Sequence, residues 1–194
     1  MKSIAARKVM TMSRLILTVA LALATCRTYA LAQGHGALQT SPNLDVSRYL
    51  GRWHEIAKFP NRFQKKCVSD TSAHYSLRPD GHIDVLNQCR RADGEWDKAL
   101  GQARQIGGSG SARLEVRFAP AWLSFLPWVW GNYWIVDLDE KYEMVAVSDP
   151  GREYLWILSR TTTVDPVRYA ALLARLTDAG LDVGRLEKTA QPQH

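Results

Sequence analysis

From residue 52 to residue 159, apolar and polar side chains alternate in eight short runs, and turn-forming residues separate each run from the next. The alternation is clearest from residue 112 to residue 118, where Ala, Leu, Val and Phe take every second position between charged residues. Because successive side chains of a β-strand point to opposite faces, this pattern predicts strands with one apolar and one solvated face. The predicted strands are residues 52–58, 68–77, 83–89, 96–106, 112–118, 132–138, 142–147 and 154–159.

After Arg160 the spacing of apolar residues changes from two to three or four, which predicts an amphipathic helix. Asp165 is a favourable N-cap, Pro166 suits the first helical turn, and Gly180 suits the end. The stripe expected to pack on the rest of the fold consists of Tyr169, Leu172, Leu173 and Leu176. A helical turn is also predicted over residues 45–50, and a short last strand over residues 185–190.

Eight short strands with tight turns, followed by one amphipathic helix, predict an all-β fold. The expected architecture is an eight-stranded antiparallel up-and-down barrel with one C-terminal α-helix packed outside. Closing the sheet removes its unpaired edges. A barrel of eight strands is just wide enough to hold one small ligand or to be filled by its own side chains. We therefore expect residues 45–190 to form one barrel domain with its helix.

The first 32 residues have the composition of a secretory signal: a basic start, an apolar run over residues 15–25, and a small-residue cleavage site, Ala30-Leu31-Ala32. The run is too short to cross a bilayer as a helix. Residues 23–26 also resemble a bacterial lipobox, in which case the leader ends at residue 25 and Cys26 is lipidated. Both alternatives place the chain in the cell envelope, as an outer-membrane lipoprotein or a soluble periplasmic protein. Residues 33–44 lack periodicity and are expected to form a flexible tether.

The formal net charge of +6 does not indicate nucleic acid as a partner, because most of it lies in the leader. Residues 1–32 hold five basic and no acidic side chains, so the rest of the chain carries only +1. No zinc-ligand spacing, nucleotide-binding glycine motif or nucleophile elbow occurs, and we expect no metal and no cofactor. Asp70 and His74 lie near two serines without a third group at a fixed spacing. We therefore expect a binding protein rather than an enzyme.

The cysteines favour one disulfide bond. Once Cys26 is removed or lipidated, only Cys67 and Cys89 remain, an even pair in an oxidising compartment. Cys67 directly precedes one predicted strand and Cys89 ends the next, so they can meet across the hairpin if a β-bulge absorbs a small register offset. Two free buried thiols are the alternative.

Short motifs are spread over nearly all of residues 45–190. They are Leu50-Gly51-Arg52-Trp53-His54-Glu55-Ile56-Ala57, Tyr75-Ser76-Leu77, Val85-Leu86-Asn87-Gln88, Arg91-Ala92-Asp93-Gly94, Tyr133-Trp134, and Asp149 with Tyr154-Leu155-Trp156-Ile157-Leu158-Ser159-Arg160. Together they resemble the lipocalin family, in particular its bacterial outer-membrane members and apolipoprotein D. The resemblance implies structural roles for Gly51, Trp53 and Arg160, with the guanidinium lying over the indole at the closed end of the barrel. Ser148-Asp149-Pro150 departs from the commoner Thr-Asp-Tyr, in a motif that serves the fold.

The resemblance implies a cavity inside the barrel, and a set of predicted inward residues is expected to contact its ligand. These residues are Tyr75, Asn87, Val116, Phe118, Trp134, Val136, Tyr154 and Trp156. A filled core is the alternative. A cavity is favoured because inward amide and hydroxyl groups need hydrogen-bond partners that a dry core does not supply.

In the family topology, the connections after the first, third, fifth and seventh strands surround the open mouth. Here they place apolar side chains beside cations, which suits a fatty acid or a lysophospholipid and also an anionic membrane surface. The residues expected at the mouth are Arg62, Phe63, Trp122, Phe125, Trp128 and Trp130. A packed plug or a homodimer contact is the alternative for the Trp-rich segment. The sequence therefore favours storage or transport of a lipid-like ligand, and the second hypothesis is an interaction module with a filled barrel.

Overall fold

The computed structural model describes residues 36–191, so the predicted leader, residues 1–32, and the lipidation candidate Cys26 lie outside the described residues. Contacts divide the chain into Met1–Gly36 and Ala37–His194, and the second unit contains every described strand and helix. Within the described residues, no helix is long and apolar enough to cross a membrane.

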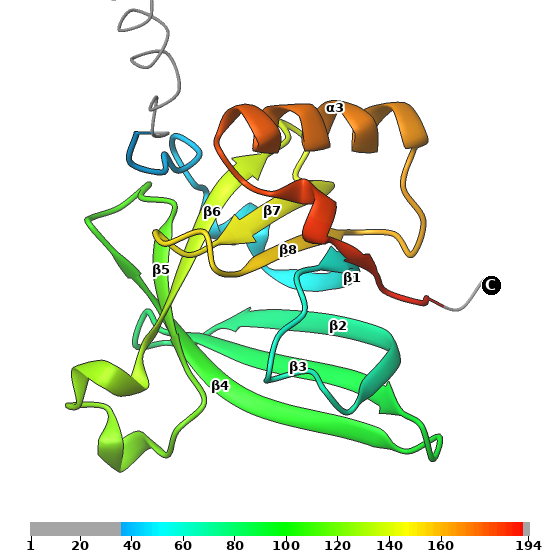
Figure 1. Cartoon of the computed structure of the whole chain (residues 1–194). Helices are drawn as coiled ribbons and strands as arrows, with labels where there is room; N and C mark the ends of the chain where they lie inside the picture. The colour runs from blue at the N-terminus through cyan, green and yellow to red at the C-terminus, as the bar shows by residue number, and fades with distance from the viewer. Residues whose placement is uncertain (1–35, 192–194) are drawn as a thin grey trace, which may run out of the picture. The chain divides into compact units, whose positions relative to one another are not determined.

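The strands form one closed antiparallel sheet (Figure 1). They are β1 Gly51–Lys58, β2 Cys67–Leu77, β3 Ile83–Arg91, β4 Trp96–Ile106, β5 Arg113–Arg117, β6 Gly131–Leu138, β7 Met144–Ser148, β8 Leu155–Ser159 and β9 Glu187–Lys188. Neighbours in sequence are neighbours in the sheet from β2 to β8, and β1 closes the barrel by pairing with both β2 and β8. The predicted eight-stranded up-and-down barrel is confirmed, with β9 added beside β1.

The helices begin where the sequence predicts. Helix α2, Val46–Tyr49, is capped by Asp45, and helix α3, Pro166–Asp178, is capped by Asp165. Short 3-10 turns occur at η2 Ala121–Leu123, η3 Pro127–Val129 and η4 Val183–Arg185. Helix α3 lies across the outside of β7 and β8 (Figure 1), with Leu172 and Leu176 buried against the outward side chains of β8.

Two apolar cores result, one inside the barrel and one between the barrel and α3. Trp53 belongs to the inner core and Ala57 to the outer core, although both lie on β1 and are an even number of residues apart. A register shift between Glu55 and Ala57 accounts for this, because an extra residue in a strand reverses the face that its successors occupy.

The predicted inward face of β6 is wrong. Trp134 and Val136 pack against the outer core, whereas Tyr133 and Ile135 belong to the barrel interior. The Arg113 guanidinium lies 4.6 Å from the centre of the Trp134 ring, on the outside of the sheet. Both faces of β6 are covered by apolar groups, so the pattern of apolar residues does not distinguish them, and a register shift after Ile135 alters the alternation as well.

The prediction of a flexible tether does not hold for residues 38–44. Leu38 is buried in the outer core and Leu44 in the inner core. The Ser41 N–H donates to the Ile135 carbonyl (2.8 Å), and the Leu44 N–H donates to the Gly110 carbonyl (2.8 Å). The segment is thus anchored to β6 and to the β4–β5 loop.

Arg160 and Trp53 hold the closed end of the barrel. The guanidinium carbon lies 3.9 Å from the centre of the indole, and the indole N–H donates to the Tyr49 carbonyl (2.8 Å). The guanidinium also donates to the carbonyls of Arg48 (2.7 Å), Arg52 (2.8 Å) and Tyr142 (3.1 Å). Gly51 has a φ of +92°, and a Cβ there would lie 3.4 Å from the guanidinium. This is the arrangement that the family resemblance implies.

The C-terminal segment, residues 187–190, joins β1 to β2 on the mouth side of the barrel; we call this junction the seam. Strand β1 pairs with β2 only from Gly51 to His54, and β9 takes the place of β2 beside Ala57 and Lys58. The Thr189 N–H donates to the Ile56 carbonyl, and the Ala190 carbonyl accepts from the Asp70 N–H (2.9 Å each). Residues 187–190 therefore lie between β1 and β2, where the two strands diverge. The sequence predicted this last strand but not its position.

The carboxylate of Glu55 links this seam to the loop between β1 and β2. Glu55 is 2% exposed, and it accepts hydrogen bonds from Gln64 Nε2 (2.5 Å) and Thr189 Oγ1 (2.6 Å). Gln191 Nε2 donates to the backbone carbonyls of Glu55 and Thr71 (2.8 Å each). Burial raises the pKa of Glu55, and the two side-chain hydrogen bonds partly oppose that effect.

Replacing Arg160 by Ala is expected to lower the free energy of unfolding by about 2–4 kcal/mol. The estimate combines about 1–2 kcal/mol for the cation–π contact with the loss of charged hydrogen bonds to carbonyls. Urea unfolding measures the change. The matched control is Arg52→Ala, whose exposed side chain is expected to contribute less than about 0.5 kcal/mol. Equal unfolding free energies for the two variants would contradict a structural role for Arg160.

Glu55→Gln is expected to gain stability over the parent protein as the pH rises. Burial raises the folded-state pKa of Glu55 above its ordinary value of 4.5, so the folded protein holds this proton more tightly than the unfolded chain. The corresponding stability is complete below the unfolded pKa and is lost as the pH rises through the folded pKa. Gln keeps the shape and removes the titration.

Urea unfolding of both proteins from about pH 4 to about pH 8 checks this expectation. The difference in unfolding free energy, variant minus parent, should increase with pH. Glu187→Gln is the control, because the Glu187 side chain is 60% exposed. A difference for Glu55→Gln that stays constant over this range would show that burial does not perturb this carboxyl.

Candidate ligand-binding site

The inner face of the barrel is packed at the closed end and opens toward the mouth. On β4, Ala103 is buried, Gly101 is half-buried and Ala99 is exposed, although all three lie on the inward face. On β3, Val85 is 2% exposed, whereas Asn87, one inward position closer to the mouth, is half-buried. The inward face is therefore packed at the closed end and borders open space in the mouth half.

Three tyrosines form the floor below this space. The Tyr133 hydroxyl lies 2.7 Å from that of Tyr49 and 2.9 Å from that of Tyr75. Burial raises the pKa of Tyr75 to about 12, and it also raises the pKa of Tyr49 and Tyr133 well above the ordinary value of 10. All three are therefore neutral phenols near pH 7. The expectation that the Tyr75 hydroxyl lacks a partner in the core is wrong, because Tyr133 supplies one.

An aromatic wall rises from β8 to the mouth. The rings of Tyr154 and Trp156 are stacked, with centres 5.6 Å apart and planes 7° from parallel. Phe63, on the β1–β2 loop, lies 5.7 Å from Tyr154, and the Trp156 indole N–H donates to Gln64 Oε1 (2.9 Å). Trp156 also packs against the inner core. The structure thus brings three predicted residues, Phe63, Tyr154 and Trp156, together, and Gln64, which the sequence did not single out, holds them to the loop.

The disulfide bond fixes the neighbouring part of the rim. Cys67 and Cys89 are bonded, with Cα atoms 5.5 Å apart, and Cys89 is 2% exposed. Register shifts in β2 between Cys67 and Ser72 supply the predicted bulge. The bond ties the start of β2, which has separated from β1, to β3.

The remaining predicted lining residues are dispersed. Val116 is half-buried against the inner core, and Asn87 faces inward opposite Ala73. Phe118 follows the end of β5 and is 45% exposed. Its ring covers Gly101, because a Cβ at that glycine would lie 2.7 Å from the ring. Trp134 and Val136 lie on the outer face and are absent from this interior.

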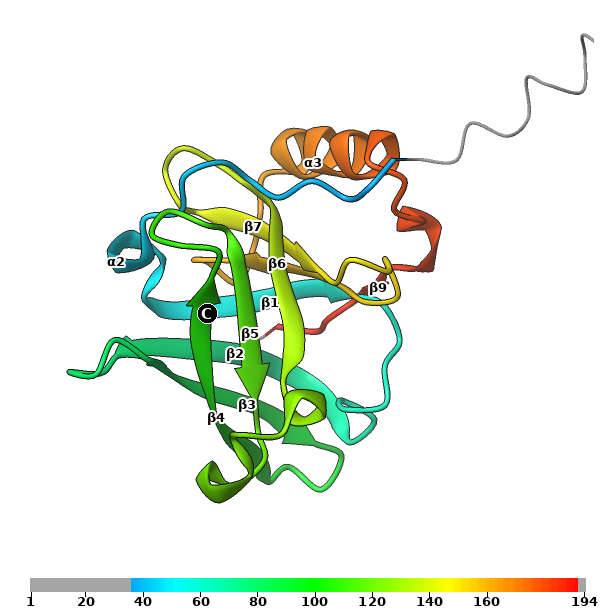
Figure 2. The ribbon, with the colours of Figure 1, turned by 90° about the vertical axis from the view of Figure 1, so that its left-hand side faces the viewer.

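The Trp-rich connection between β5 and β6 extends beside β4, at the end of the barrel away from α3 (Figure 2). Trp122, Phe125 and Trp128 are 73%, 74% and 78% exposed. Trp130 instead contacts two cations: the guanidinium carbons of Arg104 and Arg117 lie 4.1 Å and 5.2 Å from its ring centre. The connection is anchored at Trp130 and presents the other three aromatic rings to solvent.

The chemistry on the inner face is apolar and aromatic with few ionisable groups. Glu55 is the only buried carboxylate in the described part of the chain, and its oxygens are engaged by Gln64 and Thr189. Among residues 36–191, no three His, Cys, Asp or Glu side chains are grouped so that they could hold a metal ion. This arrangement suits burial of an apolar molecule with a polar end at the mouth.

Comparison with known proteins agrees with this geometry. The sequence model of the lipocalin-like domain matches residues 44–191. Temperature-induced lipocalin-1 of Arabidopsis thaliana is 40% identical over 156 residues, which cover 79% of this chain and 83% of that protein. The outer membrane lipoprotein Blc of Citrobacter freundii is 40% identical over 151 residues, covering 77% and 81%. Apolipoprotein D of Mus musculus is 36% identical over 156 residues, covering 77% and 78%.

Solved structures match the fold. Insecticyanin from the tobacco hornworm Manduca sexta superposes with a TM-score of 0.64 at 16% sequence identity, covering 80% of this chain and 85% of insecticyanin. The cockroach allergen Per a 4 gives a TM-score of 0.60 at 21% identity, covering 79% and 93%. The resemblance drawn from the sequence motifs is confirmed, and the chain belongs to the lipocalin family.

Proposed function

We propose that this protein binds a lipid-like ligand, a fatty acid or a lysophospholipid, in the mouth half of its barrel. The observation that carries the proposal is the inner face of β4, which changes from buried at Ala103 to exposed at Ala99. The stacked rings of Tyr154 and Trp156 provide an apolar wall beside this space. At about 25 cal/mol per Å² of apolar area, burial of a few hundred Å² of an acyl chain provides several kcal/mol before the costs of association.

The rim of the barrel provides groups for a polar head. Gln64 accepts a hydrogen bond from the Trp156 indole of the aromatic wall, and the β1–β2 loop also carries Arg62, Lys65 and Lys66. These cations favour an anionic carboxylate or phosphate over a neutral head group. The proposed mechanism is burial and release without a chemical step.

The proposed location is the bacterial cell envelope, where the protein stores or transports its ligand. Support comes from the Blc proteins, which are outer membrane lipoproteins and match about three quarters of this chain. Lipidation of Cys26 would attach this chain to the outer membrane, and removal of the whole leader would leave it soluble in the periplasm.

We also propose that the β5–β6 connection contacts a membrane surface. Trp122, Phe125 and Trp128 are each more than 70% exposed, and residues 118–130 contain no charged side chain. Aromatic rings of this kind are favourable at the boundary between water and lipid. A second candidate function rests on the same exposed rings: a structural or interaction module that docks through them to a partner or to a second copy. Detection of a lipid bound inside the barrel would favour the lipid-binding function over the interaction module.

Ala99→Trp is expected to weaken lipid binding at least about tenfold, because a large ring on the inward face of β4 would occupy the space proposed for the acyl chain. Isothermal titration calorimetry with oleate and with 1-oleoyl-lysophosphatidylethanolamine measures the affinity. Lys98→Trp is the matched control, since it adds the same ring to the outward face of the same strand and should leave the affinity unchanged. Equal affinities for the two variants, or no binding by the parent protein, would contradict the proposed site.

The double variant Trp122→Ala with Trp128→Ala is expected to reduce partitioning into vesicles of phosphatidylcholine and phosphatidylglycerol by at least about tenfold, because two amphipathic rings are lost. Co-sedimentation with vesicles measures the change. Val167→Ala, which removes an equally exposed apolar side chain from α3, is the control. If the double variant also alters the concentration dependence of sedimentation velocity in lipid-free buffer, the rings serve contact between copies instead.

A further inference from the structure

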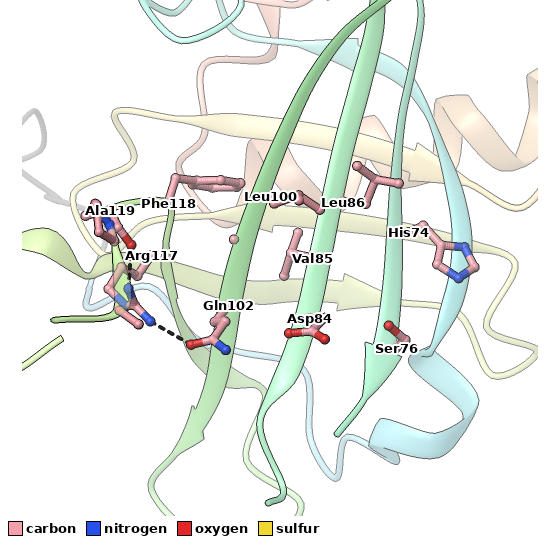
Figure 3. Close-up of a pocket in the computed structure, with 13 residues that line it drawn as sticks. His74, Ser76, Asp84, Val85, Leu86, Leu100, Gln102, Arg117, Phe118 and Ala119 are labelled. Carbon is pink, nitrogen blue, oxygen red and sulfur yellow. Dashed lines mark hydrogen bonds between the residues drawn. The ribbon is translucent and has the colours of Figure 1, made fainter. Parts of the chain in front are cut away.

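A groove of about 620 Å³ lies on the outer face of the barrel, over β2, β3 and β4. Leu86 and Leu100 face each other across β3 and β4 and form its base. They point outward, because they alternate with Val85, which belongs to the inner core. The start of the β5–β6 connection, from Phe118 to Ala121, forms one side (Figure 3). Most of its lining residues are thus on the outer face, and the inward residues Val85 and Gly101 also border it.

Arg117 lies at the side of this groove formed by β5 and is 4% exposed. Its Nη2 donates to Gln102 Oε1 (2.6 Å) and its Nη1 to the Ala119 carbonyl, as Figure 3 shows. The Nε–H is buried without a hydrogen-bond partner. Within the described residues no carboxylate forms an ion pair with it, and the acid nearest in sequence, Glu115, is paired with Arg104 instead.

A buried guanidinium without an anion is unfavourable, since burial removes its hydration and the stacking on Trp130 and two neutral acceptors replace only part of it. An anion entering the groove would complete the site. The one carboxylate that lines the groove, Asp84, lies on β3 and is paired with Arg78 (3.4 Å). The unpaired positive charge is thus at the β5 side.

The rest of the groove is suited to an acyl chain. Leu100 is 76% exposed and Phe118 is 45% exposed, and both line the groove together with Leu86. Exposed large apolar side chains that adjoin a pocket indicate an apolar ligand. The groove therefore combines a cation at one side with an apolar base, the two elements that a phospholipid requires.

We propose that this groove is a second lipid site, which binds an anionic phospholipid of a membrane surface with its phosphate on Arg117 and one acyl chain along Leu100 and Leu86. The proposal rests on the proposed membrane contact of the β5–β6 connection. Ala119 to Ala121 border the groove, and the exposed ring of Trp122 follows directly. A connection that enters the head-group layer would bring a phosphate to Arg117.

Two variants test the site by independent routes. Arg117→Gln removes the charge, and Leu100→Glu places an anion on the exposed base of the groove. Each is expected to lower partitioning into vesicles containing phosphatidylglycerol by about fivefold or more, the effect of one cation near a charged membrane. Partitioning into pure phosphatidylcholine vesicles should change little. The matched control is Leu77→Glu, which adds the same charge at a 54% exposed leucine outside the groove.

The outcomes separate this site from the other proposals. Partitioning of Arg117→Gln and Leu100→Glu equal to that of Leu77→Glu overturns it, whereas the membrane contact stands if the Trp122 and Trp128 variant still loses partitioning. If Ala99→Trp loses the preference for phosphatidylglycerol, the preference belongs to the barrel interior. That result would also overturn the proposed groove site. A thermal shift with inorganic phosphate that depends on Arg117, without any preference among vesicles, identifies a free-anion site instead. If Arg117→Gln lowers the unfolding midpoint, the partitioning of Leu100→Glu alone tests the proposal. The Leu100 side chain is largely solvated in the parent protein, so its replacement should not disturb the fold.

Discussion

Closure of the sheet through β1 is the constraint on which the rest of the structure depends. This strand pairs with β8 along one edge and divides its other edge between β2 near the closed end and β9 near the mouth. Because β2 separates from β1 after His54, the C-terminal segment has to supply the missing backbone partners. Glu55 and Gln191 secure that segment with hydrogen bonds. The barrel can therefore be wider at its mouth than at its floor while its hydrogen bonds remain satisfied.

The two ends of the closed barrel differ in the charged and aromatic groups that cover them. At the narrow end, the Arg160 guanidinium covers Trp53 and satisfies several carbonyls that the first strand and the turn before it leave unpaired. At the mouth, no comparable cover exists among the described residues, and the inward face at Ala99 is exposed. On the outside, α3 covers the strands on one side of the barrel, whereas the groove over β2, β3 and β4 lies open.

The sequence predicted the strands, the helix with its Asp165 cap, and the disulfide bond, because each depends on local alternation, capping or parity. It failed where the outcome depends on tertiary contacts. Trp134 and Val136 were assigned to the wrong face, since α3 supplies an apolar environment outside β6 that no local pattern reveals. The role of Leu38 depends on the same outer core. The burial of Arg117 follows from the connection folding back over β5, and its charged side chain gave no signal in the alternating pattern.

The hydrogen bonds among the three tyrosine hydroxyls at the floor of the barrel bear on how a ligand would be oriented. If the hydroxyls of Tyr49, Tyr75 and Tyr133 lacked partners, they would attract a polar head to the bottom of the barrel. They bond to one another instead, and burial keeps them neutral, so the floor offers no positive charge to an anion. The polar and cationic groups are at the rim, near Gln64 and Arg62. An amphiphile in the barrel would therefore place its tail toward the tyrosines and its head at the mouth, the end of the barrel that also carries the exposed aromatic rings.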